Sequence, residues 1–122
     1  MLSVQRRSPV HYDLCNQTVT VYHRAEDGSI IRMVLCNAFF EHRKTVSTDK
    51  TGSREDNTFL LVIPGEAQPV FPGDKVLPGE GPDCADRAAW ASLIPAKVLG
   101  LVVVREVSPQ YWRGQIVHWE AK

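Results

Sequence analysis

The sequence predicts a small, mainly β protein: a β-barrel or sandwich of roughly six to seven strands, with one short helix and a long polar loop. Short segments of alternating or continuous apolar residues recur along the chain, and turns rich in glycine and proline separate them. At 122 residues the chain is long enough for one hydrophobic core. No internal repeat or domain boundary is visible, so we expect a single β-barrel domain over residues 17–122.

The first 16 residues precede this domain and show no sustained periodicity. They include two adjacent cations, Arg6 and Arg7, and Pro9. Terminal segments of this kind are usually ordered only where another surface holds them. We therefore expect residues 1–16 to form an extended N-terminal arm that becomes ordered on a neighbouring molecule.

The first strand is expected at residues 17–23 (QTVTVYH), where polar and apolar side chains alternate. Val19 and Val21 fall on one face, which is typical of a half-buried strand. Asp27-Gly28 follows, and this dipeptide is a strong signal for a hairpin turn.

The second strand is expected from Ile30 to about Cys36, and residues 39–42 continue it after an interruption at Asn37 and Ala38. A strand that bends in this way is common in small barrels, where bulges help the sheet to close.

A polar run of fifteen residues, RKTVSTDKTGSREDN, extends from Arg43 to Asn57. A loop of this length in a compact domain is usually functional or disordered. Charged residues of both signs occupy it: Arg43, Lys44, Lys50 and Arg54, with Asp49, Glu55 and Asp56. Alternatively, this polar run is a solvated hairpin tip with no functional role.

The next strand is the apolar run at residues 58–63, after which residues 64–82 contain five prolines and four glycines and are mostly turn. A short amphipathic helix is expected at residues 86–94, with Asp83 or Asp86 as its N-cap and Pro95 closing it.

Two further strands are expected in the C-terminal part of the chain. Residues 99–108 (LGLVVVREVS) are the most β-branched segment, residues 109–114 read as a turn, and residues 115–120 form the last strand.

The charge balance limits the classes of partner. Fourteen acidic and fourteen basic side chains give a formal net charge of zero. General nucleic-acid and acidic-membrane binders usually carry a basic surplus, although a locally charged surface is compatible with this balance. A net charge near zero suits a protein that functions in an assembly.

Cysteine usage and the first residues suggest a reducing compartment. Cys15, Cys36 and Cys84 form no paired spacing, which is typical of reduced thiols in a cytoplasmic product. The N-terminus lacks the apolar region of a signal peptide, and no apolar run approaches the roughly 20 residues of a membrane helix. We expect a soluble protein without membrane contact.

No motif predicts a catalytic residue, a cofactor or a metal. The histidines and cysteines lack the short paired spacing of structural zinc sites. Cys36 is expected to pack as a small apolar residue, and His23 and His118 to lie exposed on strand faces. Nucleophile-elbow and phosphate-loop motifs do not occur in the sequence. An enzyme is therefore the least supported class.

The aromatic residues near the C-terminus admit two interpretations. Tyr111, Trp112 and Trp119 can form a platform for nucleic acid or sugar. More often, aromatics beside a tight turn and in a terminal strand close the core of a small barrel. Trp90, on the short helix, is expected to plug one open end of the barrel.

Several segments together resemble a family of small uncharacterised phage proteins. These segments are TVTVYHR, DGSIIRMVLCNAFFEHRKTVSTDKTGSRE, NTFLLVIPG, GDKVLPGEGP and WASLIPAKVLGLVVVREVSPQYWRGQIVHWEA. The family occurs in prophages and long-tailed phages of Gram-positive bacteria, among head and head–tail joining genes. The likeness runs from about residue 16 to the end, and its most specific parts are the DKTGSR and YWRGQIVHWEA segments. The general layout is also similar to that of the head-completion, or stopper, proteins of phage necks, which are small β-barrels with a long loop.

This resemblance implies a structural virion protein in the neck of a tailed phage, made in the cytoplasm of the bacterial host. It implies a homo-oligomeric ring, hexameric by analogy, with a portal or adaptor ring on one side and a tail-terminator or tail-completion ring on the other. The polar loop would face a partner ring or the lumen, in possible contact with packaged DNA, and Arg6 and Arg7 would contact a neighbouring ring. The resemblance supplies no catalytic residues.

Two alternatives remain open. The first is another neck ring protein, such as a tail terminator; an adaptor fits less well, because adaptors are largely helical. The second is a small β-barrel nucleic-acid-binding module that uses Tyr111, Trp112 and the cations of the polar loop.

Overall fold

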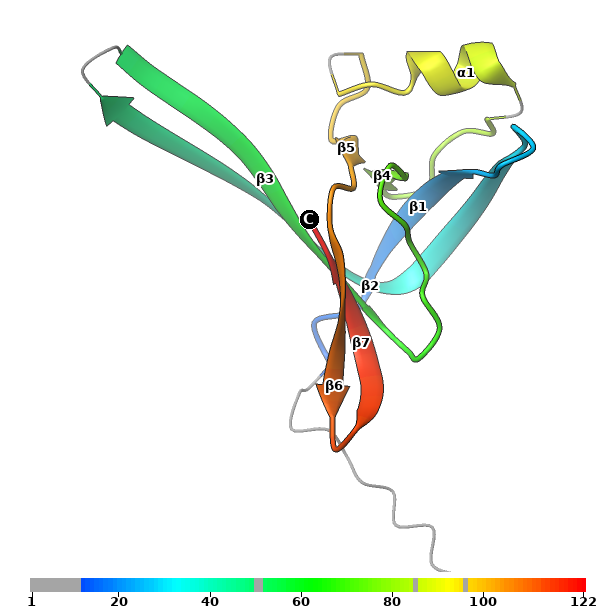
Figure 1. Cartoon of the computed structure of the whole chain (residues 1–122). Coiled ribbons are helices and arrows are strands. Elements are labelled where there is room, and N and C mark those ends of the chain that lie inside the picture. Colours follow the sequence, from blue (N-terminus) through cyan, green and yellow to red (C-terminus); the bar gives the residue numbers. More distant parts are fainter. Residues whose placement is uncertain (1–11, 50–51, 85, 96) are drawn as a thin grey trace, which may run out of the picture.

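The computed structural model describes residues 12–49, 52–84, 86–95 and 97–122 of the chain. Seven antiparallel strands form one curled, half-barrel sheet in the order β5-β4-β1-β2-β3-β7-β6 (Figure 1). The strands are β1 (Gln17–Arg24), β2 (Ile30–Asp49), β3 (Gly52–Pro64), β4 (Lys75–Pro78), β5 (Val102–Val103), β6 (Val107–Trp112) and β7 (Gln115–Ala121). With the single short helix α1 (Arg87–Ser92), this arrangement confirms the predicted fold class.

The sheet curls because long segments change partners along their length. Residues 30–38 of β2 pair with β1, and residues 39–49 pair with β3. The register shifts between the pairs Val19↔Leu35 and Gln17↔Ala38, where two residues of β2, Cys36 and Asn37, lie opposite Thr18 alone. The bulge is therefore on β2, where the sequence predicted a bend, although β2 remains one continuous strand. Bulges of this kind increase strand twist and help a sheet to curve.

A second segment, residues 102–112, joins the two ends of the sheet. Its first part, β5, pairs with β4, and its last part, β6, pairs with β7. Between them, the backbone N–H of Val104 donates to the Asp74 carbonyl (2.9 Å) and the N–H groups of Arg105 and Glu106 donate to the Lys122 carbonyl (2.9 and 2.8 Å). The expected single strand at residues 99–108 is therefore two short strands, because the chain crosses from one sheet edge to the other.

The position of Pro109 also differs from the prediction. Pro109 lies inside β6, and the turn is confined to Arg113 and Gly114. β6 is an edge strand, where a residue without an N–H is tolerated. Both turn residues have positive φ (51° and 80°), which matches the twist that a tight hairpin turn requires.

The main core lies inside the curl of the sheet. It is formed by Val19, Val21, Ala38, Phe59, Leu61, Ile63, Val70, Val76, Val102, Val104 and Ala121. A smaller cluster beneath α1 contains Tyr22, Cys84, Leu93 and Leu101. Because Thr20 and Tyr22 are also fully buried, β1 is covered on both faces rather than half-buried as predicted.

Helix α1 begins after Asp86, one of the two predicted N-caps, and ends at Ser92, two residues before the expected end. The Asp86 carboxylate accepts a hydrogen bond from the Ala89 N–H (2.7 Å), which satisfies a free donor of the first turn. The side chain of Trp90 packs against the smaller cluster, and Lys75 Nζ lies 4.4 Å from its ring centroid. The helix therefore covers the second cluster and shields a buried lysine.

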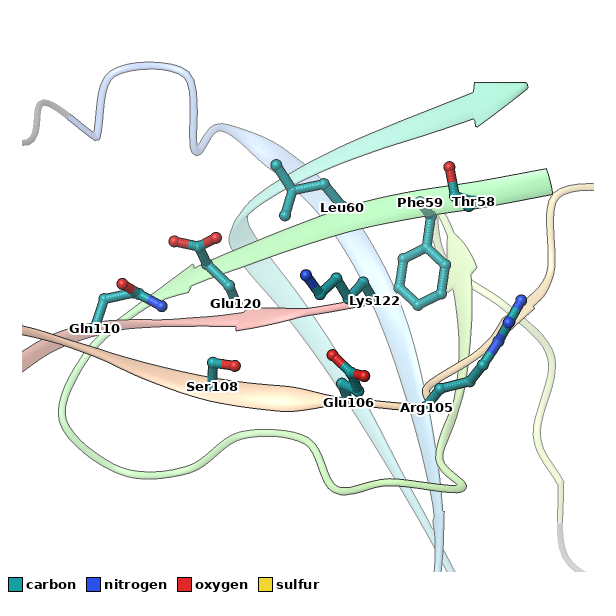
Figure 2. Close-up of a pocket in the computed structure, with 9 residues that line it drawn as sticks. All are labelled: Thr58, Phe59, Leu60, Arg105, Glu106, Ser108, Gln110, Glu120 and Lys122. Atoms are coloured by element: carbon teal, nitrogen blue, oxygen red, sulfur yellow. The ribbon is translucent and has the colours of Figure 1, made fainter. Parts of the chain in front are cut away.

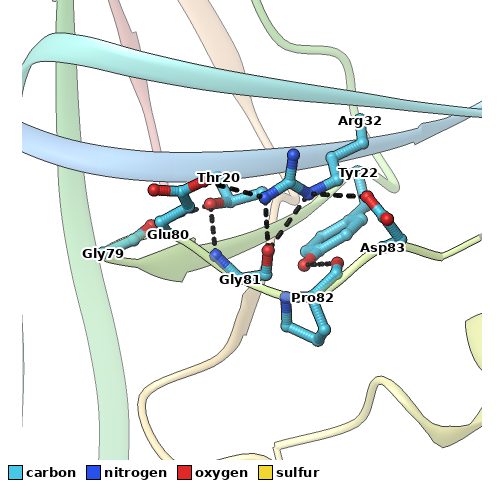
Figure 3. Close-up of polar contacts among 8 residues, drawn as sticks. All are labelled: Thr20, Tyr22, Arg32, Gly79, Glu80, Gly81, Pro82 and Asp83. Atoms are coloured by element: carbon cyan, nitrogen blue, oxygen red, sulfur yellow. Dashed lines mark hydrogen bonds and ion pairs between the residues drawn. The ribbon is translucent and has the colours of Figure 1, made fainter.

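A polar latch holds residues 79–83 across β1 and β2 (Figure 3). Thr20 Oγ1 donates to the Gly79 carbonyl and accepts from the Gly81 N–H, both at 2.8 Å. The Tyr22 hydroxyl donates to the Pro82 carbonyl (2.6 Å), and the Arg32 guanidinium donates to the Gly81 carbonyl. Burial raises the pKa of the Tyr22 hydroxyl, which keeps it a donor. These contacts fix a proline- and glycine-rich segment that has no regular structure of its own.

Candidate assembly surface

The polar run is a projecting two-stranded ribbon and not an irregular loop. β2 and β3 pair continuously from Phe39↔Val62 to Asp49↔Gly52. Figure 1 shows this hairpin extending well away from the rest of the chain. We call residues 43–49 and 52–57 the β2–β3 arm. The sequence of the arm has no apolar face, which is why hydrophobic periodicity alone does not predict a strand here.

Most of the predicted loop residues lie on this arm. Arg43, Lys44 and Asp49 are on β2, and Arg54, Glu55 and Asp56 are on β3. Lys50 falls outside the described residues, as do Arg6 and Arg7 of the N-terminal arm. The backbone register sets Lys44 opposite Asn57, Thr45 opposite Asp56 and Ser47 opposite Arg54.

The arm has two strand edges without strand partners in the described part of the chain. β1 pairs with β2 only as far as Ala38, and β7 pairs with β3 only from Leu61 onward. Unpaired strand edges present backbone donors and acceptors to which another strand can add. An isolated two-stranded ribbon is only marginally stable in water. The arm is therefore suited to association with another polypeptide.

Aromatic side chains anchor the base of the arm. Phe59 is buried in the main core, and its ring stacks on that of Phe40 with a centroid distance of 5.8 Å. The ring of His42 meets Phe40 edge to face at 6.0 Å. The arm thus leaves the body from a rigid, packed support.

A polar groove of about 620 Å³ lies beside this base (Figure 2). It is lined by Thr58, Phe59, Leu60, Arg105, Glu106, Ser108, Gln110, Glu120 and Lys122. Residues of β3, β6 and β7 thus share one face with charges of both signs. This groove was not predicted from the sequence, although polar residues at alternate positions, 106, 108 and 110 and again 120 and 122, are a sign of a polar sheet face.

A second, more apolar groove of about 350 Å³ shares Phe59 and Arg105 with the first. Its wall is formed by residues 99–103, among which the side chain of Leu99 is 98% exposed. A fully exposed leucine beside an open groove adds apolar surface next to the arm's base.

The described start of the chain is fixed to β7. The Tyr12 hydroxyl lies 2.9 Å from His118 Nδ1, and His118 Nε2 lies 3.0 Å from the Glu120 carboxylate. His118 is buried, so the prediction of an exposed strand-face histidine was wrong. Its Nδ1 holds the end of the predicted N-terminal arm on the sheet, while Nε2 is engaged by Glu120 of the same strand, and only a long-range contact of this kind could reveal that role.

His23 is likewise engaged rather than free. Its Nδ1 lies 2.6 Å from the buried Asp74 carboxylate, which also accepts from the Phe71 N–H (2.9 Å). The pair braces the turn at residues 71–74. Among the described residues, no group of three or more His, Cys, Asp or Glu side chains is placed to hold a metal ion.

Lys75 is nearly buried. Its Nζ donates to the Trp90 carbonyl (2.7 Å), and burial lowers the pKa of its ammonium group. These contacts tie β4 to the end of α1.

The thiols of Cys36 and Cys84 are expected to differ in reactivity. Cys36 is exposed, contrary to the prediction that it packs as an apolar residue, whereas Cys84 is buried and burial raises its pKa. Because the thiolate is the reactive form, Cys36 should react with iodoacetamide at least about tenfold faster than Cys84. Peptide mapping by mass spectrometry measures both rates, and equal rates in denaturant provide the control. Equal rates in the folded protein would contradict the burial of Cys84.

The C-terminal aromatics do not close the main core. Tyr111 is 63% exposed, and Trp112 is half-buried with the Arg113 guanidinium 4.8 Å from its ring centroid. Trp119 is half-buried and donates from Nε1 to the Glu66 carbonyl (3.0 Å). The tip of the β6–β7 hairpin therefore presents an aromatic side chain to solvent.

No helix in the described part of the chain is both long and apolar enough to cross a membrane. Compared with protein-family models, curated proteins and solved structures, the chain matches none of them.

Proposed function

We propose that the protein is a structural subunit of a tailed-phage neck: a head-closure, stopper-like component of a ring between the portal or adaptor and the tail. The observation that supports this proposal is the projecting β2–β3 arm. Neither of its outer edges pairs with another strand in the described part of the chain, so a strand of another molecule can add there. The sequence resemblance supports the phage neck as the setting. In that setting the arm meets a partner ring or the lumen, and Arg6 and Arg7 contact a neighbouring ring.

A ring subunit must make a heterologous contact that closes on itself. Mixed charges suit such a contact, because opposite charges across a boundary set partner choice and register more than they add affinity. The arm carries charges of both signs, and the groove at its base does so as well.

Deleting residues Lys50–Glu55 should leave the body folded and abolish assembly. The described core lies outside the arm, so we expect less than about 1 kcal/mol of lost stability. Circular dichroism and urea unfolding measure the stability, and complementation of phage that lack the gene measures the assembly. A deletion variant that is unfolded, or one that builds normal virions, would remove the arm from this role.

Electron microscopy of particles made without the gene tests the neck assignment itself. Emptied heads beside complete, unattached tails are expected. DNA-filled heads with tails of abnormal length would indicate a tail terminator, and normal infectious virions would contradict the neck assignment.

One observation favours a nucleic-acid-binding module as a second candidate. Exposed Tyr111 and the Trp112–Arg113 pair lie at the same hairpin tip, and each offers an aromatic ring on which an unpaired base can stack. Titration with single-stranded DNA at increasing salt distinguishes this function, because phosphate contacts release counterions and give a steep salt dependence. No described residue supports a catalytic role.

A further inference from the structure

We propose that the sheet has an open strand position beyond the end of β7, and that residues 1–11 of a neighbouring copy fill it as an added strand. We call this position the β7 gap. It lies between Phe59 of β3 and residues 103–105, which run from β5 toward β6, and both grooves open onto it. The inference rests on the homo-oligomer of the proposed function and specifies the contact between copies.

The β7 gap exists because β7 is shorter than its two neighbours. Leu61 of β3 and Val107 of β6 are both register partners of Ala121, so the two strands stand two strand spacings apart there, roughly 10 Å. Past Ala121, β3 extends to Phe59 and beyond, and the other segment extends back to β5, with no strand of the described chain between them. Figure 2 shows Phe59 and Arg105 beyond the end of β7.

Backbone groups on both sides point into the β7 gap. The Gly65 N–H donates to a carbonyl of β7 (3.1 Å), and because backbone direction alternates along a strand, the N–H and C=O of Phe59 point the same way. On the other side, the Val104 N–H donates to the Asp74 carbonyl (2.9 Å), so the groups of Val103 point away from β4 and into the gap. No strand of the described chain pairs with these groups of Phe59 and Val103. Backbone groups in this position can pair with an added strand.

The two faces of the β7 gap differ in polarity. Both grooves include Phe59 and Arg105, so they meet at the gap. Leu60, the next residue of β3, lines only the polar groove, whereas His42, opposite Phe59 in the register, lines only the apolar groove with Leu99. Successive side chains of a strand point to opposite faces, so the grooves open on opposite faces of the sheet. The gap therefore suits a strand in which apolar and polar residues alternate.

The beginning of the sequence has a short pattern of this kind. Residues 2–5 are Leu-Ser-Val-Gln, so in a strand Leu2 and Val4 would share one face and Ser3 and Gln5 the other. Residues 1–11 lie outside the described residues. Eleven extended residues span up to roughly 36 Å, which is more than the few residues that the gap requires.

The direction of the added strand favours a neighbouring copy as the donor. A strand antiparallel to both β3 and β6 runs in the direction of β7 and therefore away from His118. Tyr12, which follows the donor segment, is held at His118 of its own copy (2.9 Å). A chain that filled its own gap would have to reverse direction in the few residues before Tyr12. Donation between copies needs no reversal, and because donor and gap are different surfaces, the contact is heterologous and can close into a ring.

Cross-linking between two kinds of chain tests the donor and the gap together. In a C15S/C36S background, chains carrying V4C are mixed with chains carrying L99C and treated with a short bis-maleimide. Cross-linked dimers are expected from the mixture and not from either variant alone. Leu99 is exposed, so its replacement should leave the fold intact. The background without an added cysteine controls for the buried Cys84.

Substitutions on the two faces of the donor segment give a matched comparison. L2D/V4D directs two carboxylates toward the apolar groove and should raise the concentration needed for assembly at least about tenfold, measured by analytical ultracentrifugation. S3D/Q5D changes the net charge equally on the polar face and should shift that concentration less than about threefold. Equal effects of the two variants would contradict the assignment of the faces.

A chain that lacks residues 2–10 tests the gap without its donor. It should remain folded, because the described core lies between Val19 and Ala121, and it should remain monomeric. It should also bind a synthetic peptide of residues 1–11, measured by isothermal titration calorimetry. The same peptide with L2D/V4D is the control and should not bind.

Three outcomes would overturn the inference. A cross-linked monomer from chains that carry both V4C and L99C would show that the segment fills the gap of its own copy. Oligomers that persist in the truncated chain would show that copies meet elsewhere, which leaves the proposed function standing. A wild-type protein that stays monomeric at millimolar concentration, with a truncated chain that does not bind the peptide, would contradict the added strand. The neck assignment is then decided by the particles made without the gene.

Discussion

Replacing Gly81 with alanine is expected to destabilise the protein by about 2–4 kcal/mol. A Cβ at this position would overlap the Tyr22 hydroxyl and would lie 2.8 Å from Leu77 Cδ2. Tyr22 is fully buried and its hydroxyl is held by the Pro82 carbonyl, so the ring cannot yield without losing that hydrogen bond. Urea unfolding followed by tryptophan fluorescence measures the loss.

Two further variants identify the cause of this loss. Y22F removes the overlapping oxygen, so G81A should cost less in the Y22F background than in the wild type. G114A has no neighbour within 4 Å and changes only a turn with φ of 80°, so a cost of about 1 kcal/mol is expected. A G81A variant as stable as the wild type would show that the latch segment shifts freely.

Replacing Phe59 with alanine is expected to cost about 3–5 kcal/mol. The side chain is buried in the main core and stacks on Phe40 at the base of the arm. Its loss leaves a cavity where the ribbon joins the body, so the arm should also become more mobile. Chemical denaturation measures the stability, and hydrogen exchange of the arm amides measures the mobility.

The variant F59L separates volume from aromatic stacking. Leucine retains most of the buried apolar surface, so a loss below about 1.5 kcal/mol is expected. If F59A and F59L were equally destabilising, the base of the arm would be held by stacking on Phe40 and not by the filled core volume.

Features that depend on neighbouring residues could be predicted from the sequence. The Asp27-Gly28 turn forms as expected, with Gly28 at φ of 89° and the Gly28 N–H bonded to the Ala25 carbonyl (2.9 Å). The cap of α1 at Asp86 follows from side-chain chemistry that acts over three residues. The mainly β class follows in the same way, because alternating apolar patterns and turn residues are local signals.

Features that depend on pairing between distant segments could not be predicted. The polar run lacks an apolar face, so its sequence predicts a loop, yet pairing between its two halves makes it a two-stranded ribbon. Pro109 reads as a turn residue, and only the place of β6 at a sheet edge allows it within a strand. The sequence predicts a surface position for His118, because nothing nearby in sequence indicates its contact with Tyr12, 106 residues away.

The sequence by itself therefore determined the mainly β class, the helix with its cap, the first hairpin turn and the concentration of charge between residues 43 and 57. The tertiary structure alone decided that this charged run is a ribbon with two unpaired edges, that a polar groove lies at its base, and that Gly81 must lack a side chain. The physical reason is the distance along the sequence over which each interaction acts. Turn and cap preferences arise from atoms a few bonds apart, whereas free edges, grooves and close contacts exist only after segments distant in sequence have packed together.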